Sequence, residues 1–173
     1  MKSFAKVKQG YAYFILVIDV FSRFVHTFPL CSTRGQETAS VLETFFRTGR
    51  KLITDKGTAY RNRDVQCLLK REKMDHFFTK NEQKSSYAER AIKTIKSNLS
   101  RYMSRHQTHR WIDVLDSMMQ CYNGSYHRSI KMTPRGVTKR DESRNCSTAE
   151  WRPGKKRNRV SPSRRETLCR FRT

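Results

Sequence analysis

The run Tyr11–Ile18, YAYFILVI, constrains the fold of this chain more than any other stretch. It is aromatic, β-branched and almost wholly apolar, and it lacks the alternation of polar and apolar residues that is typical of a strand with one solvent-exposed face. Such a strand is expected to bury both of its faces. The chain is therefore predicted to contain a β-sheet that packs against other elements on both sides.

Turn formers and apolar spacing divide the next hundred or so residues into alternating elements. Asp19 and Ser22 mark a turn, and a second strand is predicted over Phe24–Phe28, where Pro29 is expected to stop it. Later apolar periods predict a helix, a strand, a helix, a strand and two helices, at about 35–47, 52–53, 62–73, 74–78, 86–106 and 111–123. This alternation predicts an α/β fold.

Basic residues outnumber acidic ones so far that the formal net charge is +22. Such a surface repels itself unless a polyanion neutralises it, so nucleic acid is the first candidate partner. A membrane is the second candidate. However, the sequence has neither the roughly 18-residue apolar run of a spanning helix nor a basic amphipathic helix with one continuous apolar face. We therefore expect DNA, and no membrane, as the partner.

The composition changes after Ser125. Residues 138–173 carry many arginines and lysines, a few separated apolar residues and turn formers such as Pro153-Gly154. Such a segment buries too little apolar surface to offset its chain entropy. We therefore expect one core domain over residues 1–137, followed by a basic tail over 138–173 that is disordered and has no strand. Five scattered cysteines, with no C-x-x-C pair, are typical of reduced thiols in an intracellular protein.

Two carboxylates, Asp55 and Glu89, lie at positions in an α/β fold where ligand-binding sites are common. Asp55 follows the short strand at Leu52-Ile53, and open α/β sheets bind ligands at the carboxyl ends of their strands. Glu89 lies in the first turn of the helix predicted over 86–106, where it could complete an oxygen cage for Mg²⁺. Each has a structural alternative: Asp55 begins an Asp-Lys-Gly turn, and Glu89 forms a capping box with Ser86. Spacing alone leaves both alternatives open.

Lys93 and Lys96 follow Glu89 by four and seven residues, which places the three side chains on one helix face. The lysines would line the approach to a metal held by the carboxylates, and a phosphodiester fits between them. The alternative is a solvated face, or an ion pair between Glu89 and Lys93.

Four blocks together resemble a known family. They are GYAYFILVIDVFSRFVHTFPL, KLITDKGTAY, NEQKSSYAERAIKTIKSNLSRYM and CYNGSYHRSIKMTP, at 10–30, 51–60, 81–103 and 121–134. In order and spacing they are similar to the integrase catalytic core of retroviruses, retrotransposons and Maverick-type transposons, over about Lys6 to Val137. The resemblance implies a ribonuclease H-like fold and a D-D-E carboxylate triad. It also implies two Mg²⁺ or Mn²⁺ ions, and 3′-end processing and strand transfer of DNA.

The resemblance assigns roles residue by residue. Asp55 matches the second aspartate of the triad and Glu89 matches the glutamate, so both are expected to be catalytic and to bind metal. Lys93 and Lys96 match helix lysines that contact the DNA end. The motif Tyr122-Asn123 with Tyr126–Arg128 matches the end of the last core helix and the turn after it, where we expect packing rather than DNA contact.

One part of the family pattern is missing. The first triad aspartate belongs to a strand that precedes the equivalent of Ser3–Gly10, so this strand and its aspartate are expected to be absent from the chain. Asp19 is not expected to replace it, because in the family pattern this position does not bind metal. The sheet then needs another neighbour for Tyr11–Ile18, such as Phe4–Lys8 or a second chain. We expect a truncated element copy.

The leading hypothesis is therefore a DNA-binding, integrase-like polynucleotidyl transferase core that is inactive as this chain. The alternative is a non-catalytic nucleic-acid-binding protein derived from a transposon integrase. A third interpretation is a self-associating interaction module, and a homo-oligomer is left open. Lys139-Arg140 and Lys155–Arg157 resemble a two-part nuclear import signal, so a nuclear location is expected.

Overall fold

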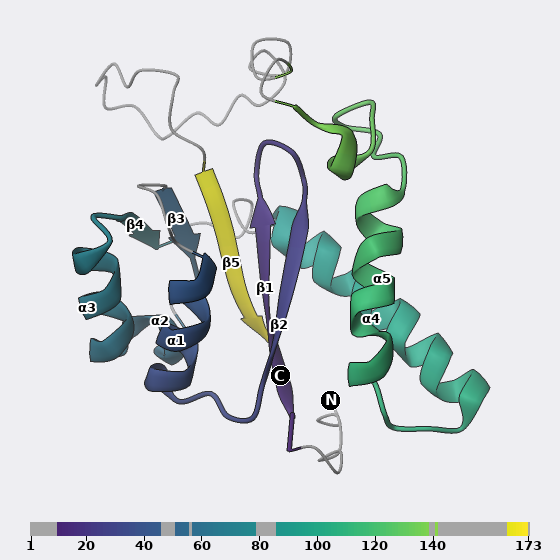
Figure 1. Cartoon of the computed structure of the whole chain (residues 1–173), viewed down its shortest axis with the longest axis horizontal. Coiled ribbons are helices and arrows are strands. Elements are labelled where there is room, and N and C mark those ends of the chain that lie inside the picture. Colours follow the sequence, from purple (N-terminus) through teal and green to yellow (C-terminus); the bar gives the residue numbers. More distant parts are fainter. Residues whose placement is uncertain are drawn as a thin grey trace.

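The computed structural model describes residues 10–45, 51–55, 57–78, 86–138 and 141, and the backbone of residues 166–172. Five strands form one sheet; they are β1 (Tyr13–Asp19), β2 (Val25–Leu30), β3 (Lys51–Thr54), β4 (Asp75–Phe78) and β5 (Glu166–Arg172). The other elements are α1 (Gly35–Phe45), α2 (Thr58–Arg61), α3 (Arg63–Arg71), α4 (Ser86–His106), α5 (Ile112–Gly124) and a short 3-10 helix, η2 (Pro134–Gly136). Figure 1 shows how these elements are arranged.

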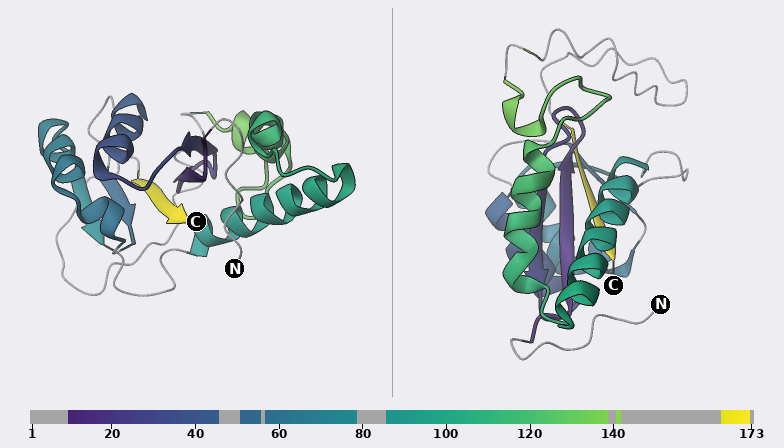
Figure 2. Two further views of the ribbon diagram at one scale, coloured as in Figure 1. Left: turned by 90° about the horizontal axis from the view of Figure 1, so that it is seen from below. Right: turned by 90° about the vertical axis from the view of Figure 1, so that its right-hand side faces the viewer.

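β1 is the doubly buried strand that the sequence predicts. Phe14, Leu16 and Ile18 pack in one apolar cluster with α4 and α5, and all three are at most 2% exposed. Ile15 and Val17 point the other way, into a second cluster with α1 and α3. The two helical layers therefore cover opposite faces of the sheet, as the view from below in Figure 2 shows. This arrangement confirms the predicted α/β fold.

The predicted hairpin is formed by β1 and β2, which pair antiparallel. Pro29 does not stop β2, because it lies inside the strand and pairs with Phe14. β2 is the outer strand of the sheet, where a residue without an N–H group is tolerated. The other predicted helices and strands are present with small shifts of their ends, whereas α2 and η2 were not predicted.

β5 is the element that departs most from the prediction. The strand order is β2-β1-β5-β3-β4, so β5 lies inside the sheet, antiparallel to β1 and parallel to β3 (Figure 1). It pairs with β1 from Phe14 to Asp19, and with β3 from Lys51 to Thr54. This corrects the expectation of a tail without strands for these seven residues. Residues 142–165 of the tail lie outside the described residues.

The physical reason is backbone hydrogen bonding. The facing edges of β1 and β3 present N–H and C=O groups beside a buried core, and such groups must be paired. Any extended segment can pair them through its own backbone, whatever its side chains. β5 takes the place beside β1 that we expected Phe4–Lys8 or a second chain to fill, and residues 1–9 lie outside the described residues.

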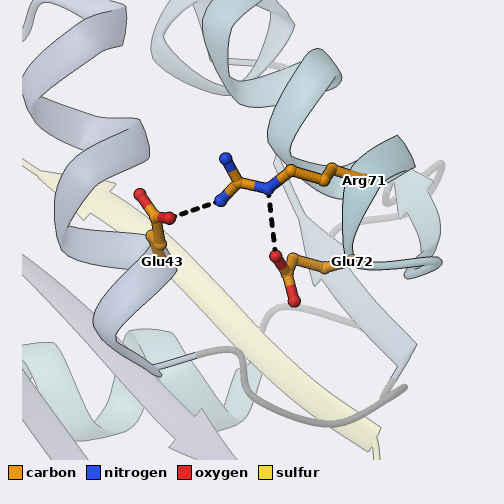
Figure 3. A network of polar contacts seen from close by, with 3 residues as sticks. All are labelled: Glu43, Arg71 and Glu72. Atoms are coloured by element: carbon orange, nitrogen blue, oxygen red, sulfur yellow. Dashed lines mark hydrogen bonds and ion pairs between the residues drawn. The ribbon is translucent and has the colours of Figure 1, made fainter.

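α1 and α3 pack closely on one face of the sheet. A Cβ added at Gly35, where α1 begins, would lie 2.0 Å from Cγ of Asn62, so glycine permits the close approach. Asn62 in turn caps α3 through its side-chain oxygen. Farther along, Arg71 of α3 binds Glu43 of α1 and Glu72 (Figure 3). The Arg71 and Glu43 side chains are exposed, so this network contributes little to stability.

α5 is fixed to the other face through Asn123. The side chain is 5% exposed; its Oδ1 accepts a hydrogen bond from the Val25 N–H and its Nδ2 donates one to the Val25 carbonyl, both at 2.9 Å. The amide thereby pairs the backbone of Val25 at the outer edge of β2. The packing role predicted for the motif Tyr122-Asn123 with Tyr126–Arg128 is confirmed at Asn123, whereas Tyr126 and Arg128 of the same motif are exposed.

Candidate functional site

Asp55 follows β3 and forms the predicted turn. Its Oδ1 accepts a hydrogen bond of 3.0 Å from the backbone N–H of Gly57. A Cβ at Gly57 would lie 2.8 Å from the same oxygen, so the glycine leaves room for the carboxylate. The structural role proposed for Asp55 is therefore present, and it engages one of the two carboxylate oxygens.

A chain of polar groups, which the sequence did not reveal, fixes the backbone at Asp55. The Thr54 hydroxyl donates to the Asp55 carbonyl at 3.0 Å and lies 2.8 Å from Nε2 of His76. Because that hydroxyl has one proton, Nε2 carries its own proton and donates it to Thr54. Nδ1 of His76 then accepts from the Gln66 amide at 3.3 Å, and Gln66 also donates to the Tyr60 carbonyl at 2.8 Å. The network ties β3, β4 and α3 together.

Glu89 lies in the first turn of α4 and is partly exposed. The buried side of α4, including Ala88 and Ile92, shares an apolar cluster with Ile53 of β3. Asp55 is two residues beyond Ile53, so strand alternation puts it on the same face of the sheet. Both predicted carboxylates therefore border the face that α4 covers. The Ser86 side chain is not described, so the capping box stays a prediction.

The outer side of α4 is basic. Its sequence contains one acidic residue, Glu89, and five lysines or arginines. Lys93 is exposed and Lys96 is half-buried, in line with the shared face that the spacing predicts. The remaining basic residues of the helix are exposed; they are Arg90, Arg101 and Arg105. The DNA contacts expected of Lys93 and Lys96 stay predictions.

Asp19 does not reach this site. Its carboxylate accepts hydrogen bonds from the Phe21 N–H at 3.1 Å and the Ser22 hydroxyl at 2.8 Å, which closes the turn after β1. In the sheet, Asp19 is level with Leu52, three residues before Asp55. At about 3.3 Å per residue, the two aspartates are offset by about 10 Å along the strands, in addition to being two strands apart. Asp19 is a turn residue, as expected.

The strand next to Asp55 carries an arginine at the same level. Thr54 pairs with Cys169, so Asp55 is level with Arg170, one residue further along both strands. Arg170 also pairs with Leu16, whose side chain belongs to the cluster under α4. Directly opposite residues share a face, so position 170 lies on the face that α4 covers.

These residues do not fit a site for two divalent ions. Such a site needs several carboxylates to offset the ionic charge, and the sequence predicts two of them among the described residues, Asp55 and Glu89. Among the described residues, no group of three or more His, Cys, Asp or Glu side chains is placed to hold a metal ion. We therefore derive no catalytic step through a metal.

Arg23 is a second feature that the sequence did not reveal. It is 5% exposed, and its guanidinium lies 3.5 Å from the ring centre of Tyr87 in the first turn of α4. Burial lowers the pKa of Arg23, while Tyr87 and Asp19 act in the opposite direction. Its charge also opposes the burial that raises the pKa of Tyr122 in α5. One buried cation thus joins the turn after β1 to α4 and α5.

Two further expectations bear on the setting of the site. Cys31, Cys67 and Cys121 are free in the described part of the chain, and the other two cysteines lie outside the described side chains, so the reduced state stays a prediction. No helix in the described part of the chain is long and apolar enough to cross a membrane.

Three comparisons with known proteins bear on this fold and site. Residues 2–84 match the family described as the integrase core domain. The chain is 31% identical over 145 residues to a putative uncharacterized transposon-derived protein, F54H12.3, of Caenorhabditis elegans. That alignment covers 82% of this chain and 51% of the relative, so the chain spans about half the length of the relative.

The fold is similar to that of the HTLV-2 integrase catalytic core domain, which was solved with magnesium in a trimeric form. The TM-score is 0.60 at 19% sequence identity, over 76% of this chain and 88% of the viral chain. At this identity the match concerns the fold, and it confirms the predicted ribonuclease H-like core. The matched family, the transposon-derived relative and the shared fold together support the predicted integrase catalytic core in this chain.

Proposed function

We propose that the chain is a DNA-binding, integrase-like polynucleotidyl transferase core that does not integrate DNA as this chain. The observation that carries DNA binding is the basic outer side of α4 on an integrase core. A net charge of +22 supports the same partner, because contacts to phosphates release counterions. Lys93 and Lys96 are the residues proposed to contact the backbone beside Glu89.

The proposed inactivity rests on the carboxylates. In a two-metal reaction, one ion activates the attacking oxygen and the other stabilises the leaving oxygen. Asp55 and Glu89 supply two of the carboxylates that such a site needs, and position 170 beside Asp55 is an arginine. We propose that Mg²⁺ or Mn²⁺ binds weakly here.

DNA binding is tested by fluorescence anisotropy with a labelled duplex at several salt concentrations. The double variant Lys93→Ala/Lys96→Ala is expected to bind more weakly. The slope of log K against log salt should flatten by roughly two, about 0.9 for each lost phosphate contact. Arg63→Ala/Lys70→Ala on α3 removes the same charge from exposed positions on the other face. Equal losses in both variants would show that the α4 face has no special role.

Catalysis is tested by a strand-transfer assay with Mg²⁺. No product above background is expected. Robust activity that Asp55→Asn abolishes would refute the proposed inactivity. Activity that survives both Asp55→Asn and Glu89→Gln would instead refute the assignment of the site.

The alternative is a non-catalytic nucleic-acid-binding protein whose basic tail does most of the binding. The charge of residues 138–173 favours it. Deleting the whole tail is not a clean test, because β5 belongs to the sheet. Replacing Lys155, Lys156 and Arg157 with alanine leaves β5 in place. A larger loss of DNA affinity in this variant than in the α4 variant would support the alternative.

We also propose a nuclear location and self-association. A fluorescent fusion should lose nuclear accumulation when the basic cluster Lys155–Arg157 is replaced by alanine, and unchanged accumulation would reject the signal. Self-association is suggested by the trimeric form of the similar viral core. Sedimentation at rising concentration should show an increasing mean mass, whereas a constant monomer mass would contradict this.

A further inference from the structure

The segment after α5 combines exposed cations with an exposed aromatic ring. Residues 126–138 contain no acidic residue, and Arg128, Lys131 and Arg135 are exposed. Tyr126 is 68% exposed, more than any other large apolar side chain in the described part of the chain. Arginines bind phosphates through several donors, and aromatic rings stack on unpaired bases. The two kinds of residue together are suited to single-stranded nucleic acid.

This segment is held in place by the protein. The backbone of His127 pairs with Met132, with a hydrogen bond of 2.9 Å from the His127 N–H to the Met132 carbonyl. Ile130 is 5% exposed and anchors the middle of the segment. Lys131 has a φ of 54°, a left-handed conformation that costs energy for a lysine and is common at functional sites. A ligand would therefore meet a backbone that is already held in one conformation.

The segment also adjoins the basic side of α4. Burial lowers the pKa of His127, and the charges of Arg23 and Arg90 lower it further. Arg90 is exposed and precedes Lys93 by three residues on the helix. Figure 2 shows the start of α4 and the end of α5 at the same end of the molecule. The cationic surface thus continues from the segment onto α4.

Arg23 adds buried charge beneath this surface. In the described part of the chain, its Nε and Nη1 are buried and have no hydrogen-bond partner. Little solvent screens a buried cation, so the charge of Arg23 acts on His127, while Asp19 offsets part of it.

We propose that Arg90, Tyr126, Arg128 and Arg135 form a binding surface for an unpaired DNA end, with the arginines on phosphates and the Tyr126 ring stacked on a base. The surface deepens the proposed function: Lys93 and Lys96 hold the duplex, and this surface holds the strand that leaves it. The binding is non-covalent and needs no metal ion.

The first test separates stacking from charge. Affinities of the full chain are measured for a blunt duplex and for the same duplex with a short single-stranded overhang. Tyr126→Ala should weaken overhang binding at least about fivefold, the low end for loss of one base stack, and leave blunt-duplex binding unchanged. Tyr126→Phe keeps the ring and should restore overhang binding. Unchanged overhang binding in Tyr126→Ala would overturn the proposal.

The second test concerns the arginines. Arg128→Ala/Arg135→Ala should flatten the salt dependence of overhang binding by one to two, because single strands lose about 0.7 in slope per phosphate contact. The α3 double variant Arg63→Ala/Lys70→Ala should keep the wild-type slope. Equal flattening in both would overturn the assignment. A third outcome is that Tyr126→Ala leaves the affinity for the overhang unchanged, while Arg128→Ala/Arg135→Ala abolishes binding of a polyglutamate peptide. The surface would then bind an acidic protein instead of DNA.

These results are distinguishable from failure of the proposed function. A chain that binds no DNA at all would contradict the proposed function itself. A chain that binds DNA through Lys93 and Lys96, yet is indifferent to changes at Tyr126, Arg128 and Arg135, contradicts this inference alone.

Discussion

At the scale of single residues, the hydrogen bonds of His76, which lies beside the Asp55 turn, depend on its protonation state. The neutral His76 ring donates from Nε2 to Thr54 and accepts from Gln66 at Nδ1. A proton added at Nδ1 would remove the acceptor and place a charge in a half-buried site. Burial accordingly lowers the pKa of His76 below its ordinary value of 6.5. Protonation of His76 is thus expected to weaken its link from β4 to α3.

The free energy of unfolding should fall as the pH drops below 6.5, the ordinary value for histidine. In that range the unfolded chain takes up a proton at His76 before the folded chain does, so acid favours unfolding, and the loss ends once folded His76 is also protonated. Urea unfolding of wild type and His76→Gln just above and below this pH checks the effect.

The His76→Gln variant should lose less stability over this range. His127 also has a lowered pKa and acts with the same sign, so the double variant His76→Gln/His127→Gln should be the least sensitive. Identical pH profiles for all three proteins would contradict the link.

At the scale of elements, the junction of α1 and α3 depends on one glycine. Gly35→Ala would force the new Cβ into Asn62, the residue that caps α3. Overpacking and loss of the cap should together cost about 1–3 kcal/mol of unfolding free energy. Gly124→Ala at the end of α5 meets no atom within 4 Å and is the matched control. It should be neutral or stabilising by up to about 1 kcal/mol. Thermal unfolding of both variants measures the difference, and equal melting temperatures would refute the packing argument.

The interior strand β5 offers a gain-of-binding test. Arg170→Asp would put a carboxylate level with Asp55, where an arginine now stands. The affinity for Mn²⁺, measured by calorimetry, is expected to rise, and Asp55→Asn should cancel the gain. Arg172→Asp adds the same charge two residues farther along and should give a smaller gain. Equal gains for Arg170→Asp and Arg172→Asp would mean that the sheet register does not position the ligand.

Sequence reasoning located most elements because their signals are local. The apolar run of β1 and the three-to-four residue spacing of apolar residues in α4 can be recognised in the sequence. β5 has no such signal, since Arg170 and Arg172 interrupt its apolar residues and its pairing partners are far away in sequence. The same holds for the candidate site. Asp55 and Glu89 stood out by position, whereas His76 and Arg23 matter only through contacts that the fold creates.

At the scale of the whole molecule, the two helix-covered faces of the sheet differ in charge. The face with α1 and α3 carries the exposed ion pairs of Arg71 with Glu43 and Glu72, which balance charge locally. On the other face, α4 carries five lysines or arginines and one acidic residue, and residues 126–138 contain no acidic residue, while Arg110 pairs with Asp113 at the start of α5. DNA is therefore expected to meet the protein from the α4 side.

The place of β5 in the sheet has a consequence for protein synthesis. β5 follows every other described element in the chain, yet it lies between β1 and β3. During translation, these strands emerge from the ribosome long before the strand that joins them. A chain arrested before Glu166 should therefore be cleaved readily by protease, whereas a chain extended past Arg172 by a linker that spans the exit tunnel should resist. The sheet can thus be completed only after β5 has left the exit tunnel.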